Sequence, residues 1–143
     1  MDAADGSTVV TSGSNVTQWN DKSGNARNGT AVNSPALQTN TLNGLPVITF
    51  NSSSSQYFNF GNIMPIGTSQ IYVFSVFKFN DSSNGSIIAK SRQASGGGRW
   101  FLVRESGSGG LQFDIGLSPT IVGTSVFSDT STNSRLITSY WDR

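Results

Sequence analysis

Short apolar runs separated by turn-forming residues dominate this chain, and no stretch keeps the period of an amphipathic helix. Each run has the length of one strand, and Gly, Asn, Ser or Pro stands in nearly every gap. The pattern therefore predicts an all-β fold of the β-sandwich type. The clearest predicted strands are L-P-V-I-T-F (45–50), Q-Y-F-N-F (56–60), I-Y-V-F-S-V-F-K-F (71–79), S-I-I-A-K (86–90), R-W-F-L-V-R-E (99–105), L-Q-F-D-I-G (111–116) and R-L-I-T-S-Y-W (135–141).

Composition supports strands over helices. Of the 143 residues, 50 are Ser, Thr or Asn, while charged residues make up only 12%. Neutral polar side chains favour the solvent faces of strands and turns, whereas exposed helix faces usually carry Lys, Glu and Arg. The length suits one domain, which we expect to span 1–143.

Charge and hydropathy limit the partners. A net charge of +1 offers no basic field for a polyanion, so nucleic acid is not an expected partner. No apolar run has membrane-spanning length, and the N-terminus lacks the basic and apolar regions of a secretion signal. The chain is therefore expected to be part of a larger exported protein, or a virion protein assembled inside a cell.

The nine-residue run from Ile71 to Phe79 is apolar at most positions of both faces. It predicts a central strand, covered by the second sheet on one side and by loops or a neighbour on the other. Left exposed, such a strand would promote aggregation.

The stretch W-N-D-K-S-G-N, Trp19 to Asn25, is predicted to be a structural corner. Trp19 is expected to be an anchor at the core or its rim. The Asp21 carboxylate is expected to accept hydrogen bonds from the backbone of Ser23 or Gly24, with Gly24 at positive φ.

These segments carry a family resemblance. D-A-A-D-G-S-T-V, then N-V-T-Q-W-N-D-K-S-G-N-A-R-N, then L-N-G-L-P-V-I-T-F-N and the final L-I-T-S-Y-W-D resemble bacterial and phage laminin-G-like domains of the concanavalin A-like lectin and glucanase superfamily. The resemblance implies a two-sheet antiparallel jelly roll, found as an accessory module in adhesins, tail proteins and polysaccharide-degrading enzymes. Such modules commonly bind glycans or proteins.

Two departures from that family pattern concern the ends of the chain. Only Met1 stands where the family has an apolar first strand, and the chain stops at Arg143 where the family continues through further strands. These departures predict a fragment, or a domain completed by strand exchange or by packing in an oligomer.

Catalysis is not expected. Glucanases of this superfamily use paired carboxylates, and the chain has one glutamate, Glu105, and no histidine or cysteine. If Glu105 faces Leu111 across a hairpin, Asp114 falls on the outer face near Arg104, away from Glu105. Asp114 is then expected to form a surface ion pair with Arg104, worth about 0.2–1 kcal/mol.

Calcium is a candidate ligand, because many domains of the resembled family hold it at the sandwich rim. The loop N-D-S-S-N-G offers oxygen ligands from Asn80, Asp81 and Asn84, but Ser91 stands where an EF-hand loop would have its closing glutamate. The same letters also suit a hairpin turn without metal, which is the favoured alternative.

Glycan binding would need an exposed aromatic ring flanked by polar groups. The alternation of 99–105 predicts Trp100 on the outer face with Arg104 and Asp114, and Tyr57 is a further candidate. The alternative for Trp100 is packing beneath a loop or against a neighbouring subunit. A cluster of basic residues that could meet an acidic sugar, or simply face solvent, comprises Lys90, Arg92, Arg99 and Arg104.

Two functions remain after these exclusions. One is a non-catalytic carbohydrate-binding or adhesion module on an extracellular, cell-surface or virion protein. The other is a structural or assembly domain, such as a virion, tail or surface-filament subunit, that binds no small ligand.

Overall fold

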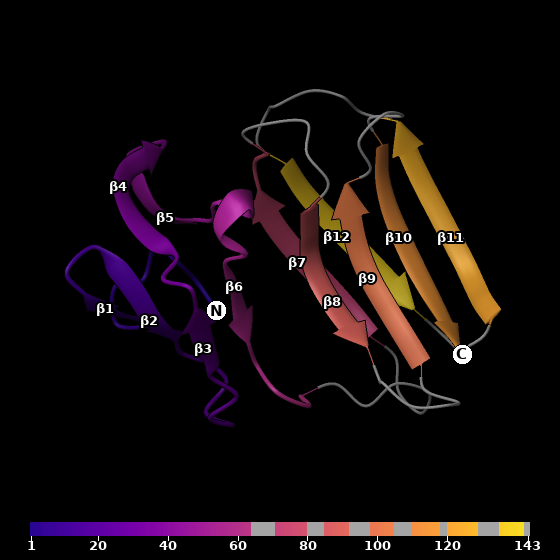
Figure 1. The fold of residues 1–143 in the computed structure, drawn as a ribbon, viewed down its shortest axis with the longest axis horizontal. Helices are drawn as coiled ribbons and strands as arrows, with labels where there is room; N and C mark the ends of the chain where they lie inside the picture. The colour runs from indigo at the N-terminus through magenta and orange to yellow at the C-terminus, as the bar shows by residue number, and fades with distance from the viewer. Residues whose placement is uncertain are drawn as a thin grey trace. The chain divides into compact units, whose positions relative to one another are not determined.

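A computed structural model gives the fold of the chain. The residues that it describes are 1–63, 71–79, 85–91, 98–104, 110–117, 120–128 and 135–141. These residues form mostly strands, joined in antiparallel pairs, with a single turn of 3-10 helix (Figure 1). The predicted all-β class is confirmed at this level.

The chain divides into two compact units, Met1–Met64 and Pro65–Arg143. Unit 1 holds one six-stranded sheet, in which five strands follow the order β5-β4-β2-β3-β6 and β1 pairs with β2. Its elements are β1 (Val9–Ser12), β2 (Asn15–Trp19), β3 (Gly29–Val32), β4 (Ala36–Leu42), β5 (Leu45–Thr49), η1 (Ser52–Ser54) and β6 (Tyr57–Asn59).

An aromatic cluster covers one face of the unit 1 sheet. Register places Val9, Trp19 and Gly29 in one row and Ala31 opposite Phe58 in the next. The ring of Phe58 lies 5.5 Å from that of Trp19 between centroids, and 5.8 and 6.1 Å from those of Phe50 and Phe60. Aromatic pairs of this kind contribute about 0.5–1.5 kcal/mol each beyond the area that they bury.

Gly29 is the point where the cluster meets the backbone. It is buried, and a Cβ added there would lie 2.2 Å from the nearest ring atom of Phe60. The absence of a side chain therefore lets the Phe60 ring lie directly on strand β3.

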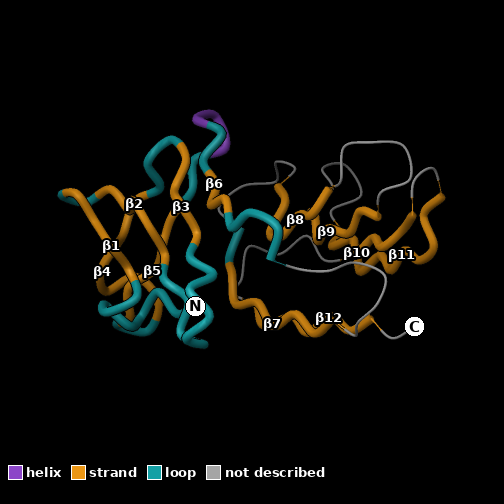
Figure 2. Tube along the Cα trace, turned by 90° about the horizontal axis from the view of Figure 1, so that it is seen from below, coloured by secondary structure: helices purple, strands orange, loops and turns teal. Residues whose placement is uncertain are grey.

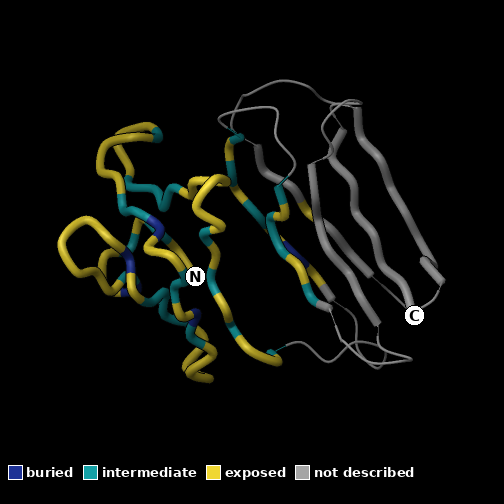
Figure 3. The backbone as a smooth tube through the Cα atoms, viewed as in Figure 1, coloured by how far each residue is buried: buried dark blue, intermediate teal, exposed yellow. Residues whose placement is uncertain are grey.

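Burial in unit 1 is otherwise shallow (Figure 3), and Val16 and Pro35 are its most deeply buried side chains. The Val16 N–H donates to the Pro35 carbonyl at 2.7 Å, and the Leu37 N–H donates to the Ser14 carbonyl at 2.9 Å. These two bonds join β2 to β4 where Asn15 pairs with Ala36.

Unit 2 contains two sheets that share no strand (Figure 2). One has the order β11-β10-β9-β8, and the other consists of β7 paired with β12. The bounds are β7 (Ile71–Phe77), β8 (Gly85–Ser91), β9 (Gly98–Arg104), β10 (Gly110–Leu117), β11 (Thr120–Ser128) and β12 (Arg135–Trp141).

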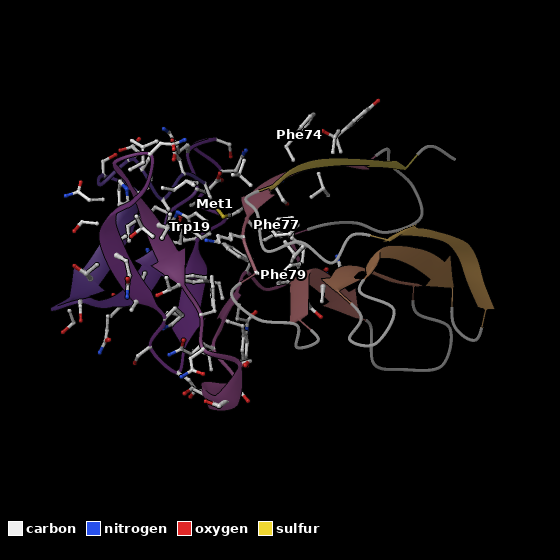
Figure 4. The ribbon with its side chains drawn as sticks, turned by 90° about the horizontal axis from the view of Figure 1, so that it is seen from above. Met1, Trp19, Phe74, Phe77 and Phe79 are labelled. Carbon is white, nitrogen blue, oxygen red and sulfur yellow. The ribbon has the colours of Figure 1, made fainter. Side chains whose placement is uncertain are left out.

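Strand β7 alternates between a buried and an exposed side. Val73 is buried, whereas Tyr72, Phe74 and Val76 are exposed, Phe74 by 70%. In Figure 4, Phe74 projects from one side of the β7–β12 pair, and Phe77 and Phe79 lie on the other side. The face that carries Phe74 is thus exposed in the single chain, and its cover by a neighbouring chain stays a prediction.

The seven predicted strands all occur, with ends shifted by two residues or fewer. Five further strands, β1 to β4 and β11, lie in segments where no clear strand was predicted. Within the described ranges, no helix has the length and hydropathy to cross a membrane.

Candidate functional site

The corner formed by Trp19 to Asn25 is held by the carboxylate of Asp21. Its Oδ1 accepts from the Ser23 N–H at 2.9 Å, and its Oδ2 accepts from the Ser23 hydroxyl and, at 3.3 Å, from the Arg27 N–H. The hydroxyl of Ser23 and then its N–H hold the pKa of Asp21 below the ordinary value. The bond from the Ser23 N–H to the Asp21 carboxylate makes this an Asx-type turn, and Gly24 follows it at φ +79°.

An ion pair connects this corner to the N-terminal segment. Lys22 Nζ lies 2.7 Å from Asp5 Oδ2 and 3.9 Å from Asp2 Oδ2. The Lys22 ammonium, with help from the side chain and N–H of Ser7, lowers the pKa of Asp5 from 3.8 to about 2. In return, Asp5 raises the pKa of Lys22. Asp5 and Lys22 are thus both charged throughout the neutral range.

Thr8 holds the same N-terminal segment through hydrogen bonds to its backbone. It is buried, and its hydroxyl lies within hydrogen-bonding distance of the carbonyls of Asp2 and Asp5, at 2.6 and 2.9 Å. The Thr8 carbonyl accepts from the Asn20 N–H at 2.7 Å. The carboxylates of this corner are therefore engaged by turns and by Lys22, which is the pattern of a structural junction.

The second candidate site is the edge of unit 1 around Tyr57. Tyr57 begins β6, pairs with Val32 of β3, and is 51% exposed. Its neighbour Phe58 turns to the aromatic cluster, so Tyr57 and Asn59 belong to the opposite, outer face of the strand. An exposed ring on a sheet edge is the kind of surface on which a sugar ring stacks.

The amide side chains of Gln56 and Asn33 hold the loops beside Tyr57 together, and we call Asn33, Gln56 and the backbone N–H of Asn51 the amide clamp. Gln56 Nε2 donates to the carbonyls of Asn33 and Ser34 at 2.9 and 3.0 Å, and its Oε1 accepts from the Asn51 N–H at 2.6 Å. Asn33 Nδ2 donates to the Ser55 carbonyl at 3.1 Å. The clamp thereby ties the β3–β4 loop to the turn that precedes β6.

The backbone beside Tyr57 adopts left-handed conformations at three non-glycine residues. These are Asn33 at φ +58°, Ser34 at φ +56° and Ser55 at φ +49°. Such conformations cost about 1–2 kcal/mol for a residue with a Cβ and persist where surrounding contacts impose them. The hydrogen bonds of the amide clamp provide those contacts, so the loops around Tyr57 are conformationally fixed.

The predicted patch of Trp100, Arg104 and Asp114 on one face is contradicted by strand register. Leu111 pairs with Arg104 instead of Glu105, which puts Asp114 opposite Phe101 and Trp100 opposite Ile115. A shift of one residue moves every position to the other face of a strand. Trp100 and Arg104 therefore keep a common face, and the position of Asp114 belongs to the other one. An ion pair between Asp114 and Arg104 is therefore no longer expected, because the two positions belong to opposite faces.

The remaining predicted residues are only partly placed. Lys90 stands opposite Trp100 in register, and burial lowers the pKa of Lys90. Arg99 pairs with Ser91. Other residues of the predicted calcium, basic and carboxylate sites lie outside the described residues, namely Asn80, Asp81, Asn84, Arg92 and Glu105. Among the described residues, no three His, Cys, Asp or Glu side chains gather to hold a metal ion.

Comparisons with protein-family models, curated proteins and solved structures found no match. The side chains of the described residues are therefore the basis for inferring function. Of these, Tyr57 is a predicted binding residue whose neighbours within unit 1 are described.

Two features of the sites were missed at the level of sequence. Gln56 bridges to Asn33 and Ser34 across 22 or more residues, and Lys22 meets Asp5 across 17. The D-A-A-D-G-S segment, with two carboxylates near the N-terminus, was a signal for the second contact. No sequence signal distinguished Gln56 from other polar loop residues.

Proposed function

We propose that this protein is a non-catalytic carbohydrate-binding or adhesion module that binds sugar through Tyr57. The observation that carries the proposal is a half-exposed tyrosine ring on a sheet edge, beside loops fixed by the amide clamp. A preformed aromatic surface binds with little loss of conformational entropy, and adjacent amide and carbonyl groups supply hydrogen bonds to hydroxyls. Trp100 and Arg104, on a common face of β9, form a second candidate contact in unit 2.

The proposal includes a more specific fold than the all-β class. A laminin-G-like, two-sheet jelly roll would agree with the antiparallel pairing of the strands in both units. An extracellular, cell-surface or virion location follows from the proposed role in adhesion. The family resemblance also implies calcium binding by the segment around Asp81, and this stays a proposal because Asp81 lies outside the described residues.

The test is binding to a microarray of oligosaccharides, followed by calorimetric titration of the best probe with the full chain. Tyr57→Ala is expected to raise Kd at least about tenfold, because it removes the stacking surface. Tyr57→Phe keeps the ring and is expected to retain most of the affinity. Tyr72→Ala is the matched control, since Tyr72 is also an exposed tyrosine, on the other unit.

Circular dichroism spectra and thermal unfolding of each variant separate lost binding from lost folding. Undiminished sugar binding by a folded Tyr57→Ala variant would contradict the proposal. Failure of the unmodified chain to bind any carbohydrate probe would also contradict it.

A second candidate function, assembly with other subunits, is favoured by the exposed side of β7. Tyr72, Phe74 and Val76 follow one another at alternate positions of a single strand face. Contiguous exposed apolar side chains mark interaction surfaces or sites of aggregation. Under this alternative, sedimentation shows an oligomer that Phe74→Ser dissociates, while no carbohydrate probe binds.

A further inference from the structure

Asparagine followed by glycine is chemically labile. The main-chain nitrogen of the glycine loses its proton and attacks Cγ of the asparagine, a C–N bond forms, and the side-chain nitrogen leaves as ammonia. Water then opens the resulting succinimide at either carbonyl, which yields aspartate or isoaspartate. Glycine favours the attack because it has no Cβ to obstruct the approach.

The sequence contains three Asn-Gly pairs, at 28–29, 43–44 and 84–85. Asn84 lies outside the described residues, so the structure allows two of the pairs to be compared. Since both have glycine as the following residue, any difference in their reactivity must come largely from the fold.

The pair Asn43–Gly44 forms the tip of the β4–β5 hairpin. Leu42 pairs with Leu45, and the two residues between them have φ of +50° and +80°, as a type I′ turn requires. Asn43, Gly44 and Leu45 are all exposed. This turn therefore gives water and base access to the reacting groups.

The two strands below this tip are not paired in continuous register. Pairing between β4 and β5 is irregular from Gln38 to Leu42, and Asn40 lies at φ +54° within this stretch. The side chains of Thr39, Asn40 and Thr41 are exposed. Segments with few buried contacts open locally at low free energy, so the tip can reach the geometry that cyclisation needs without unfolding the sheet.

The pair Asn28–Gly29 is held in a different environment. Asn28 Oδ1 accepts from the Asp21 N–H at 2.9 Å, which fixes the amide group that would have to react. Gly29 is buried, pairs with Trp19, and lies under the Phe60 ring. Cyclisation here would break strand pairing and displace an aromatic ring.

We propose that Asn43 is a site of spontaneous, hydrolytic modification to aspartate and isoaspartate in the folded protein, and that the fold protects Asn28. The modification replaces a neutral amide with a carboxylate and brings the formal net charge from +1 to zero. The isoaspartate product also adds a methylene to the backbone of a two-residue turn. Aged protein would therefore contain a mixture of hairpin tips and carry less net charge.

The experiment is incubation of the full folded chain at mildly alkaline pH, with peptide mapping by mass spectrometry that distinguishes aspartate from isoaspartate. Asn43 is expected to convert at least about tenfold faster than Asn28, because only its conversion avoids opening the sheet. A parallel incubation in concentrated urea removes the fold, and the two rates are expected to approach each other there.

A variant separates the site from the rest of the chain. Asn43→Gln keeps an amide but lengthens the side chain, which disfavours ring closure, and is expected to abolish the product at 43 while Asn28 stays unmodified. Circular dichroism checks that this variant is folded. Equal rates at Asn43 and Asn28 in the folded chain would overturn the proposal, as would no conversion at either. So would an undiminished advantage of Asn43 in urea, since the difference would then owe nothing to the fold.

Discussion

Replacing Gly29 with alanine tests the packing that closes the aromatic cluster of unit 1. The added Cβ would lie 2.2, 2.5 and 2.8 Å from three atoms of the Phe60 ring. Ordinary contact begins at 3.4 Å, so the nearest ring atom must move by about 1.2 Å. A ring displaced by that amount loses part of its contact with Phe58, whose centroid lies 6.1 Å away.

The expected magnitude follows from two opposing effects. Overpacking a well-packed site costs about 1–3 kcal/mol, while replacing a strand glycine by alanine recovers about 0.5–1 kcal/mol of conformational entropy. Gly29 is not among the residues at positive φ, so alanine brings no backbone strain of its own. From the central values of the two ranges, we expect Gly29→Ala to lower the free energy of unfolding by about 1 kcal/mol.

The assay is equilibrium unfolding in urea, followed by tryptophan fluorescence because Trp19 lies in the affected cluster. Gly6→Ala is the matched control, since a Cβ at Gly6 meets nothing within 4 Å, and its effect is expected to stay below about 0.5 kcal/mol. In the double variant with Phe60→Ala, the ring is gone and the penalty of the Gly29→Ala substitution is expected to disappear. Unchanged stability of Gly29→Ala, or strictly additive costs in the double variant, would refute the reasoning.

Three further predictions concern the polar corner. Lys22→Met is expected to return the pKa of Asp5 from about 2 toward 3.8, as measured by carboxyl NMR titration. Because the folded pKa is lower than the unfolded one, the stability that Asp5 contributes to the unmodified protein is present above pH 3.8 and is lost as the pH falls through about 2. Asp21→Ala is expected to lower the Tm but leave sugar binding by the folded protein intact, and loss of binding at unchanged Tm would contradict the structural role of the turn. Ala26→Gly is expected to raise stability by about 0.5–1 kcal/mol in urea unfolding, because Ala26 lies at φ +55°; a lower stability would show that the turn depends on the alanine side chain.

The sequence was most informative where apolar alternation was strong. The strand predicted from Ile71 was right nearly to its end, because the run is rich in β-branched and aromatic residues and is short for a helix. Strand β2 was missed because its letters N-V-T-Q-W contain only two apolar residues, and its pairing with β3 and β1 depends on tertiary contacts. Local pattern does not report such contacts.

Register was less predictable than strand position. The alternation in 99–105 puts Trp100 and Arg104 at positions of one strand face, but the face of Asp114 depends on the register between β9 and β10. The amide clamp was invisible for a related reason, since Gln56 meets Asn33 and Ser34 only after the β3–β4 loop and the β5–β6 connection have both been placed. Long-range hydrogen bonds of this kind have no local signature.

Two edge strands of the unit 1 sheet, β5 and β6, limit how another chain could extend it there. Strand β5 carries Pro46, which has no N–H to donate, and its described pairing is with β4 alone. At the other edge, β6 is three residues long. A foreign strand would therefore find an interrupted row of donors on one side and a very short template on the other. Recruitment of further subunits along β5 or β6 would have to proceed through side chains instead of main-chain hydrogen bonds.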